Sequence, residues 1–262
     1  MYNFDNKVTV IIPTYNSEKF IERTLLSLEN QKELPDEIIF SDDGSEDKTI
    51  QIIELWVKEQ KKIKYKILKN THKGPGHARN EGIINAQNNW IAFLDSDDTW
   101  ENDKIYEVKK IMEQKKNINF ITHFEFNVNL KNKKKEISKK LKIFLQQKTD
   151  LKKFLFISNI FSTSAVTCKK DILIKNKMFD VKLQNAQDYD LWLKLSPHIN
   201  LYVIEKNLGT YYDTPNNITS RPYFKKIKAE LIISLRYRKL VNTFFFLKKI
   251  FKIFINKNWF KI

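Results

Sequence analysis

The feature that most constrains the fold is an alternation of two kinds of segment over residues 8–114. Short apolar runs such as "VTVIIPTYN" (8–16) and "WIAFLD" (90–95) alternate with longer segments whose apolar residues recur at helical spacing. Continuous β-branched and aromatic runs are typical of strands that are covered on both faces of a parallel sheet. The β-α-β-α-β-α-β-α order therefore predicts an α/β protein with a doubly wound sheet flanked by helices.

The first half of the chain gives the clearer element boundaries. We expect strands at 8–16, where Pro13 should end the β-branched run, and at 36–45, 62–68 and 90–95, with helices at 18–28, 46–60, 74–87 and 103–114. The second half gives weaker patterns. There we expect a strand at 118–126, a lysine-rich loop or exposed helix face at 131–142, a helix at 150–160, an extended segment at 161–168, and a helix at 185–195 with Leu191, Trp192 and Leu195 inward.

Composition limits the class of protein. The chain has 262 residues, of which 42% are hydrophobic, so it can bury a large core. Its single cysteine, Cys168, excludes a disulfide framework or a cysteine-based zinc site within one chain, and we expect it to be a small buried residue. Neither a secretory signal nor an apolar run of about 20 residues is present. We therefore expect a cytoplasmic protein, either soluble or peripheral to a membrane.

Polar clusters follow the apolar runs of three of the expected strands, at residues 13–16, 42–45 and 95–98. The carboxyl ends of parallel strands meet at one edge, where open α/β sheets bind ligands. Asp95, Asp97 and Asp98 crowd negative charge there, which requires a positive partner. Mg²⁺ or Mn²⁺ needs only one or two carboxylates and takes its other ligands from phosphate and water. The pattern predicts a metal ion with a diphosphate; the alternative is that each cluster merely caps a helix or forms a turn.

Five segments carry a family resemblance. They are "VIIPTYN", "SDDGSEDKT", "GHARNEGI", "FLDSDD" and "QDYDLWLKL". Their order and spacing resemble those of family 2 glycosyltransferases with the GT-A fold, over about residues 7–215. The resemblance implies a mixed doubly wound sheet and an inverting transferase that uses a UDP-sugar together with Mn²⁺ or Mg²⁺.

The resemblance also implies residue roles. Asp188 would be the general base, Asp95 and Asp97 would bind the metal, and Asp98 would lie behind them. The nucleotide-sugar would contact Pro13, Thr14, Tyr15, Asp42, Asp43, Arg79 and Asp95.

Some of these roles have rivals. Asp190 points about 200° away from Asp188 on a helix, and the inward apolar residues favour Asp188. Arg79 could instead pair with Glu81 on a helix surface, and His72 and His77 are expected to be polar loop residues. Two departures from the family pattern stand out. Gln187 replaces the acid that precedes the base, and Asp213 and Thr214 stand where many relatives hold the diphosphate with Arg or His.

The C-terminal segment, residues 222–262, is strongly basic, with eleven Lys and Arg against the single acid Glu230. On a helix, Lys248, Lys249, Lys252 and Asn256 gather on one side, opposite a broad apolar arc. This amphipathic pattern predicts that residues 240–262 dock on an anionic membrane surface. The alternative is a terminal helix that packs on the protein's own core.

Together these features predict three regions: a nucleotide-sugar-binding half (1–117), an acceptor-binding and catalytic-base half (118–221), and a basic tail (222–262). We expect transfer of a hexose (Gal, Glc or GlcNAc) to a glycan, with a GlcNAc or GalNAc on undecaprenyl diphosphate as acceptor, in O-antigen or other surface polysaccharide assembly on the inner face of a bacterial inner membrane. The lipopolysaccharide or lipooligosaccharide core is the alternative acceptor. A basic membrane- or nucleic-acid-binding protein without catalysis is the alternative class, but an acidic ligand edge argues against nucleic acid.

Overall fold

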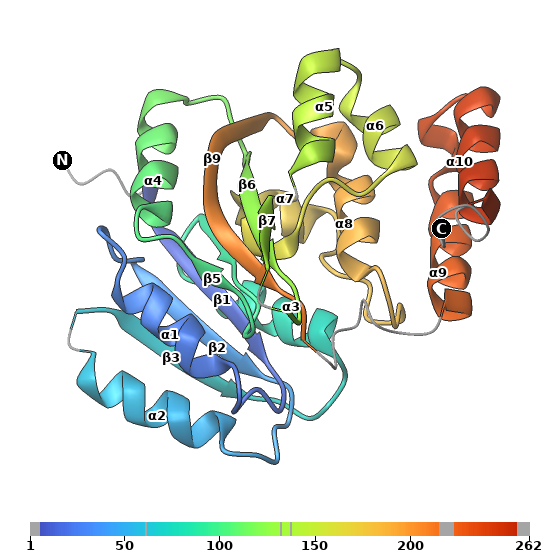
Figure 1. Ribbon diagram of the computed structural model, residues 1–262. Helices are drawn as coiled ribbons and strands as arrows, with labels where there is room; N and C mark the ends of the chain where they lie inside the picture. Colours follow the sequence, from blue (N-terminus) through green and yellow to red (C-terminus); the bar gives the residue numbers. More distant parts are fainter. Residues whose placement is uncertain (1–5, 61, 132, 137, 215–222, 256–262) are drawn as a thin grey trace.

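A single mixed sheet organises the computed structural model, which describes residues 6–60, 62–131, 133–136, 138–214 and 223–255. The sheet has nine strands in the order β3-β2-β1-β4-β8-β6-β9-β5, with β7 paired to β6 (Figure 1). Helices lie along both faces of this sheet (Figure 1). The prediction of a mixed doubly wound α/β sheet is confirmed.

The first half of the chain forms the parallel part of the sheet. Its strands are β1 (Val8–Thr14), β2 (Glu37–Asp42), β3 (Lys64–Lys69) and β4 (Trp90–Phe93), and its helices are α1 (Ile21–Glu29), α2 (Thr49–Glu59), α3 (Pro75–Asn85) and α4 (Lys104–Gln114). Every residue of β1 and β2 is buried, as continuous apolar runs predict. Pro13 lies within β1 instead of ending it. Pairing with β4 stops at Ile11 and Phe93, so the missing N–H of Pro13 breaks no ladder on that side.

The second half extends the sheet with antiparallel and parallel pairs. Its strands are β6 (Phe120–Val128), β7 (Lys134–Glu136), β8 (Thr167–Lys169) and β9 (Leu201–Tyr212), and its helices are α5 (Lys139–Gln147), α6 (Leu151–Ile157), α7 (Lys170–Lys175), α8 (Gln187–Leu195), α9 (Tyr223–Arg236) and α10 (Thr243–Ile255). The short β5 (Thr99–Trp100), which belongs to the first half, pairs with β9. The sequence patterns did not reveal β5, β7, β9 or α7. The segment at 161–168 is extended only in part, because a 3₁₀ turn at Thr163–Ala165 precedes β8.

The core between the sheet and the later helices is aromatic. Trp192 of α8 is fully buried and lies against Phe93 of β4, Phe120 of β6 and Phe179. Leu191 and Leu195 are also fully buried, which confirms the inward face predicted for this helix. Cys168 is a buried free thiol, as expected. This core fixes α8 against the middle of the sheet.

The C-terminal helix corrects the predicted orientation of the tail. α10 packs against α9 and α6, and the Lys249 ammonium lies 3.0 Å from the Glu230 carboxylate with only 3% of the residue exposed. Lys252 donates to the carbonyl oxygen of Ile157 (3.2 Å). Two of the three lysines thus face the protein, because Glu230 and the end of α6 offer them acceptors. Asn256 lies outside the described residues.

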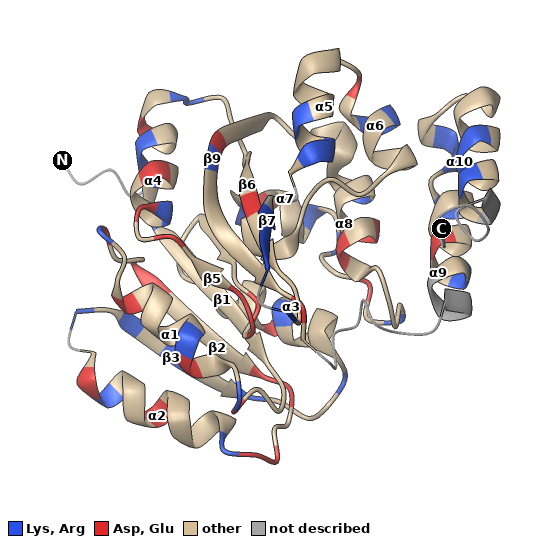
Figure 2. Cartoon of the chain, viewed as in Figure 1, with Lys and Arg blue, Asp and Glu red and all other residues tan. Residues whose placement is uncertain are grey.

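Part of the apolar arc of α10 faces outward instead. Phe244, Leu247 and Phe251 are 68%, 59% and 67% exposed. Figure 2 shows lysines on α5, α6 and α10, on the same side of the molecule. None of the helices in the described ranges combines the length and the apolar character that a membrane-spanning segment requires.

Candidate functional site

Asp42 builds a turn at the end of β2. Its Oδ1 accepts from the hydroxyls of Thr14 (2.9 Å) and Ser45 (2.5 Å), and its Oδ2 accepts from the backbone N–H groups of Gly44 (3.1 Å) and Ser45 (2.8 Å). The carboxylate therefore ties the end of β1 to the loop after β2. For this one acid, the turn alternative describes what the side chain does.

Asp43 holds the glycine loop that precedes α3. Its two oxygens accept from the backbone N–H groups of Lys73 (2.9 Å) and Gly74 (2.8 Å). Gly74 has φ +94°, which favours glycine, and α3 begins at the next residue. His72 Nδ1 lies 2.9 Å from Asp43 Oδ2, and the His72 ring stacks on Tyr15 with 4.2 Å between ring centroids. Tyr15 is 46% exposed, so this aromatic pair offers a flat surface beside the edge.

Arg79 supplies a positive partner for the acidic cluster. Its Nη2 lies 2.5 Å from Asp95 Oδ1, and its guanidinium also lies over the Phe179 ring. Arg79 is 9% exposed, so this ion pair is largely shielded from water. The pairing with Glu81 that a surface arginine would make is not seen; Glu81 lies 3.7 Å from His77.

Asp97 carries the negative charge that Arg79 does not neutralise. Burial and the charge of Asp95 raise the pKa of Asp97 to about 6. The Thr214 hydroxyl donates to Asp97 Oδ2 (3.3 Å), and Arg23 of α1 donates to the Asp97 carbonyl oxygen (2.5 Å). Thr214, one of the two departures from the family pattern, thus contacts the candidate metal ligand.

Asp98 lies behind this pair, as expected. It is 1% exposed, and its carboxylate accepts from the Ser164 hydroxyl (2.6 Å) and the Tyr212 backbone N–H (3.2 Å). Burial, with the charges of Asp97 and Asp95, raises its pKa well above the usual range. Asp98 therefore joins β9 and the turn before β8 to the acidic loop.

The Asp95 and Asp97 pair fits a hard divalent cation. Their carboxylate oxygens are suitable ligands, and a cation between them would offset the repulsion from Asp95 that, after burial, raises the pKa of Asp97. Among the described residues, no three His, Cys, Asp or Glu side chains form a complete metal site. Two carboxylates alone suit an ion that takes its remaining ligands from water and phosphate.

Asp188 and Asp190 face different parts of the molecule. Asp188 Oδ2 accepts from Asn159 Nδ2 (2.9 Å). Burial raises the pKa of Asp188, and the charge of Arg79 opposes this rise while that of Asp95 adds to it. Asp188 therefore shares one electrostatic environment with the sheet edge. Asp190 is fully buried and lies 2.6 Å from Arg236 of α9.

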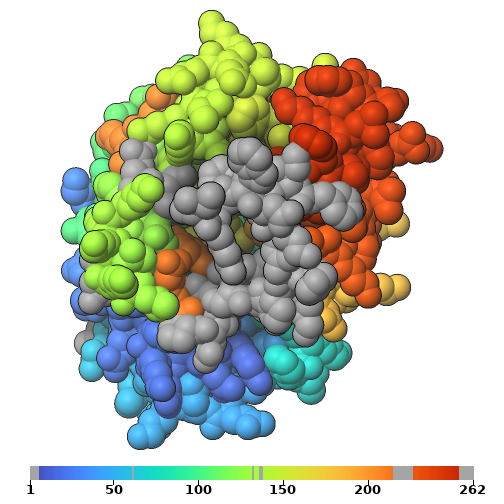
Figure 3. Space-filling view, turned by 45° about the vertical axis from the view of Figure 1, so that its right-hand side comes forward, coloured from blue at the N-terminus to red at the C-terminus, as the bar shows by residue number. Residues whose placement is uncertain are grey.

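Gln187 joins the two halves of the site. Its Nε2 donates to the Leu183 carbonyl oxygen (2.5 Å). A Cβ placed on Gly76 of α3 would lie 2.7 Å from Gln187 Oε1, so the start of α3 lies directly against the Gln187 side chain of α8. Figure 3 shows the first half of the chain below and the later helices above on one face of the molecule.

Three contacts of this site escaped the sequence analysis. Arg23 and Ser17 lie in or before α1, and Ser17 Oγ is 2.7 Å from Ser96 Oγ in the acidic loop. Asn159, which orients Asp188, follows α6. None of the three belongs to a recognisable motif, and only the fold brings them to the acids.

Comparison with known proteins agrees with this geometry. Residues 9–173 match the family described as Glycosyl transferase family 2. A Campylobacter jejuni protein named "GalNAc(5)-diNAcBac-PP-undecaprenol beta-1,3-glucosyltransferase" is 29% identical over 200 residues, covering 75% of this chain and 62% of that protein. The chain spans between 32% and 62% of the length of the first curated relatives that it matches.

Two solved structures show the same fold. Staphylococcus aureus TarS 1–349 in complex with UDP-GlcNAc has a TM-score of 0.67 at 22% identity, covering 87% of this chain and 66% of that one. The mannosyltransferase PcManGT from Pyrobaculum calidifontis, in complex with GDP-Man and Mn²⁺, has a TM-score of 0.66 at 16% identity, covering 89% and 64%. With a family match over more than half of its residues, the chain belongs to glycosyltransferase family 2 and has the GT-A fold.

Proposed function

We propose that this chain transfers a hexose (Gal, Glc or GlcNAc) from a UDP-sugar to a hydroxyl group of a glycan acceptor, with inversion at the anomeric carbon. The observation that carries the proposal is a juxtaposition of three segments that are far apart in sequence. The start of α8, next to Asp188, lies against the start of α3 at Gly76 and Gln187, and Arg79 of α3 pairs with Asp95 of the loop after β4. In this proposal residues 1–117 bind the donor, and residues 118–221 supply the base and bind the acceptor.

Asp188 acts as the general base. A sugar hydroxyl is a weak nucleophile, so a carboxylate must accept its proton while the hydroxyl oxygen attacks the anomeric carbon. The bond from that carbon to the β-phosphate oxygen breaks in the same displacement, and UDP leaves. Asn159 fixes the orientation of Asp188 through its 2.9 Å hydrogen bond. The raised pKa of Asp188 makes it a stronger base than an exposed aspartate.

The donor lies along the edge formed by β1, β2 and β4. Pro13 and Thr14 end β1 there and Tyr15 follows it. Asp42 and Asp43 shape the loops beside them, and Arg79 provides a fixed cation for the nucleotide. Asp95 and Asp97 would hold Mn²⁺ or Mg²⁺. When bound, such an ion neutralises the charge that develops on the departing diphosphate.

The acceptor proposed is a sugar on a lipid diphosphate, such as GlcNAc or GalNAc on undecaprenyl diphosphate in O-antigen or other surface polysaccharide assembly. The name of the Campylobacter jejuni relative, which describes a glucosyltransferase acting on an undecaprenol-linked glycan, supports this choice. The outward face of α10 gives independent support, because an enzyme with a lipid-borne acceptor needs contact with the membrane.

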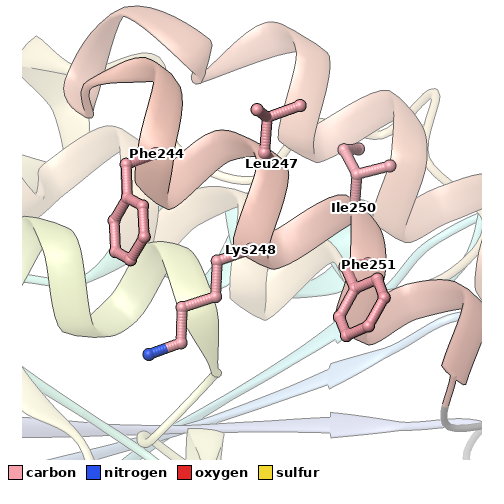
Figure 4. Close-up of a pocket in the computed structure, with 5 residues that line it drawn as sticks. All are labelled: Phe244, Leu247, Lys248, Ile250 and Phe251. Atoms are coloured by element: carbon pink, nitrogen blue, oxygen red, sulfur yellow. The ribbon is translucent and has the colours of Figure 1, made fainter.

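Residues 240–262 provide that contact in this proposal, on the inner face of the bacterial inner membrane. Phe244, Leu247 and Phe251 are exposed apolar residues on α10, and Lys248 lies between the two phenylalanine rings (Figure 4). Lys140 and Lys153 add exposed positive charge on the adjacent α5 and α6. Exposed aromatic residues with nearby lysines suit the interface of an anionic leaflet.

Transfer is tested by measuring UDP release and product formation with UDP-Glc, UDP-Gal and UDP-GlcNAc, Mn²⁺ and a synthetic lipid-diphosphate GlcNAc. We expect Asp97→Ala to abolish transfer while the fold remains intact, and the exposed control Asp171→Ala to keep full turnover. Unchanged turnover by Asp97→Ala in Mn²⁺ would contradict the metal role. Product formed only on a lipooligosaccharide core would move the enzyme to that pathway.

Membrane docking is tested by sedimentation with vesicles of phosphatidylglycerol or of phosphatidylcholine. The double variant Phe244→Ser/Phe251→Ser should lose binding to the anionic vesicles, whereas Leu26→Ser, which removes an exposed leucine from α1, should not. Binding that survives the double variant would reject α10 as the docking surface.

A further inference from the structure

A cavity of about 190 Å³ lies beside β6, outside the residues assigned to the donor. Side chains from β6, from the start of α5 and from the segment after α6 line it. Its polar lining consists of His123, Glu125, Ser138, Lys140, Asn159 and Ser162. The volume is smaller than the roughly 300 Å³ at which pockets for drug-sized ligands begin, so it suits one small ring.

Two buried polar groups in this cavity are incompletely bonded. Glu125 is 4% exposed, and although Ser162 hydrogen-bonds its carboxyl group, its Oε1 finds no partner among the described residues. His123 is 2% exposed; its Nδ1 lies 2.9 Å from the Phe124 carbonyl oxygen, while its Nε2 is equally unpartnered in the described part of the chain. Each unsatisfied buried group costs about 1–3 kcal/mol, so a small side-chain rotation that brings either atom to a hydrogen-bonding ligand in the cavity is favoured.

Gly209 of β9 lies directly against these two side chains. A Cβ on Gly209 of β9 would lie 3.1 Å from His123 Cε1 and 3.4 Å from Glu125 Oε1. Any larger residue at this position would crowd the two unpartnered groups. Glycine therefore preserves room beside them.

The buried acid and the buried imidazole of the lining favour uncharged ligand groups, while Lys140 is the cationic member of the lining. Burial raises the pKa of Glu125 to about 8 and lowers that of the neighbouring Lys104 to about 7. Burial, with the charge of Lys104, also lowers the pKa of His123 well below its usual range. Groups in neutral forms both donate and accept hydrogen bonds, which matches hydroxyl and amide groups better than ions.

The cavity adjoins the candidate base. Asn159 lines it and also donates to Asp188 Oδ2 (2.9 Å). Ser162, also in the lining, opens the turn in which Ser164 donates to Asp98 (2.6 Å). A molecule in the cavity that contacts Asn159 would thus be separated from Asp188 by this one side chain.

We propose that this cavity binds the sugar ring of the acceptor, with Glu125 and His123 hydrogen-bonding its hydroxyl or acetamido groups. The inference rests on the proposed transferase function, because Asp188 must then take a proton from the bound ring. It assigns acceptor specificity to β6, β9 and the segment after α6, separate from the donor edge.

Binding is measured without catalysis, so that failure of this inference and failure of the proposed function can be told apart. The methyl β-glycosides of Glc, Gal and GlcNAc serve as probes in saturation-transfer NMR, and UDP is titrated separately. We expect the parent protein to bind at least one glycoside. Glu125→Gln should weaken that binding about tenfold, and Gly209→Ala, which crowds Oε1 without a change of charge, should weaken it as well. Affinity for UDP should stay within twofold of the parent.

Glu107→Gln is the matched control, because Glu107 is a buried carboxylate on α4 that pairs with Lys206 and does not line the cavity. It should bind glycosides like the parent. Parent-like glycoside binding by both Glu125→Gln and Gly209→Ala would overturn the inference and leave the cavity a water site. So would a parent protein that binds UDP but none of the three glycosides. A parent protein that does not bind UDP would instead count against the proposed function.

Discussion

The edge of the sheet and the cavity beside β6 differ in how completely their acidic side chains are paired. At the edge, the oxygens of Asp42 and Asp43 accept hydrogen bonds from hydroxyls and backbone N–H groups, and Asp95 has the guanidinium of Arg79. In the cavity, Glu125 keeps one oxygen without a partner among the described residues. The edge is therefore largely preorganised by the protein itself, whereas the cavity is left for a ligand to complete.

Asp97 is the exception at the edge, and it sharpens the comparison. It lies beside Asp95, and its pKa rises to about 6 through burial and that neighbouring charge. A carboxylate in this state gains from an added cation, whereas Glu125 gains from a hydrogen-bonding ligand. The two regions thus suit different ligands: a divalent ion with a diphosphate at the edge, and a neutral sugar in the cavity.

The largest effect is expected for the acid between the two regions. In Asp188→Asn the amide oxygen can still accept the hydrogen bond from Asn159, but the side chain can no longer take a proton. We therefore expect kcat to fall by about 10²–10⁴-fold. Asp190→Asn, two residues away on α8, should keep its turnover per folded molecule, although loss of the ion pair with Arg236 lowers stability. Steady-state kinetics on both variants make the measurement. If Asp190→Asn lost turnover and Asp188→Asn kept it, the base would be misassigned.

The second prediction concerns the pH dependence of stability that the buried Glu125 causes. Its pKa in the folded protein, about 8, lies above the ordinary 4.5, so the folded state keeps a proton that the unfolded state has lost. Glu125 therefore lowers stability progressively as pH rises from about 4.5 to 8. Glu125→Gln stays neutral, and its stability relative to the parent should increase over this range by a few kcal/mol at most. Urea unfolding at several pH values checks it, and a pH-independent difference would show that Glu125 is ionised in both states.

Lys104 and Asp95 are the charged groups that influence the pKa of Glu125. The same titration is repeated with Glu107→Gln as a control. Glu107 pairs with Lys206 and shows what an ordinary salt-bridged acid contributes. Only the Glu125 variant should gain stability relative to the parent as the pH rises.

The sequence was more informative for the edge than for the cavity. Strand and helix bounds in the first half agree with the structure within a few residues, because continuous apolar strands alternate there with amphipathic helices. β9 was missed since Glu205, Lys206 and Asn207 interrupt its apolar pattern near the irregularity in its pairing with β6. The inward lysines of α10 were missed because a helical projection cannot show that Glu230 and the Ile157 carbonyl lie opposite.

The same limit applies to the site. Asp95, Asp97 and Asp188 lie in motifs with recognisable spacing. Arg23 lies in an amphipathic helix without a motif, and its contact with Asp97 depends on how α1 crosses the loop after β4. Glu125 lies in the predicted strand at 118–126, where no motif marks it. Its burial depends on β9, which the sequence patterns did not reveal, and on α5, for which they predicted only a loop or an exposed helix face at 131–142.

The third prediction tests the ion pair between Arg79 and Asp95, which preorganises the edge. Arg79→Ala leaves Asp95 without its cation, and because this pair is largely buried we expect a loss of about 2 kcal/mol in the free energy of unfolding. The donor KM should rise as well. Arg79→Ala/Asp95→Asn should recover part of the stability, since no uncompensated carboxylate remains, but it should not recover donor binding. Equal stability of Arg79→Ala and the parent in urea would show that the pair contributes little.

The smallest effect is expected where the two regions meet, at Gly76 and Gln187. Alanine favours a helix by about 0.5–1 kcal/mol over glycine, but its methyl group would lie 2.7 Å from Gln187 Oε1 and force that side chain to move, at a cost of about 1 kcal/mol. The two effects nearly cancel, so Gly76→Ala alone should leave stability almost unchanged. In a Gln187→Ala background the clash is gone and Gly76→Ala should stabilise by about 0.5–1 kcal/mol. The difference between the two backgrounds is a coupling energy. If it were zero, α3 and α8 would not pack as described, and the donor edge and the base would not be held together by this contact.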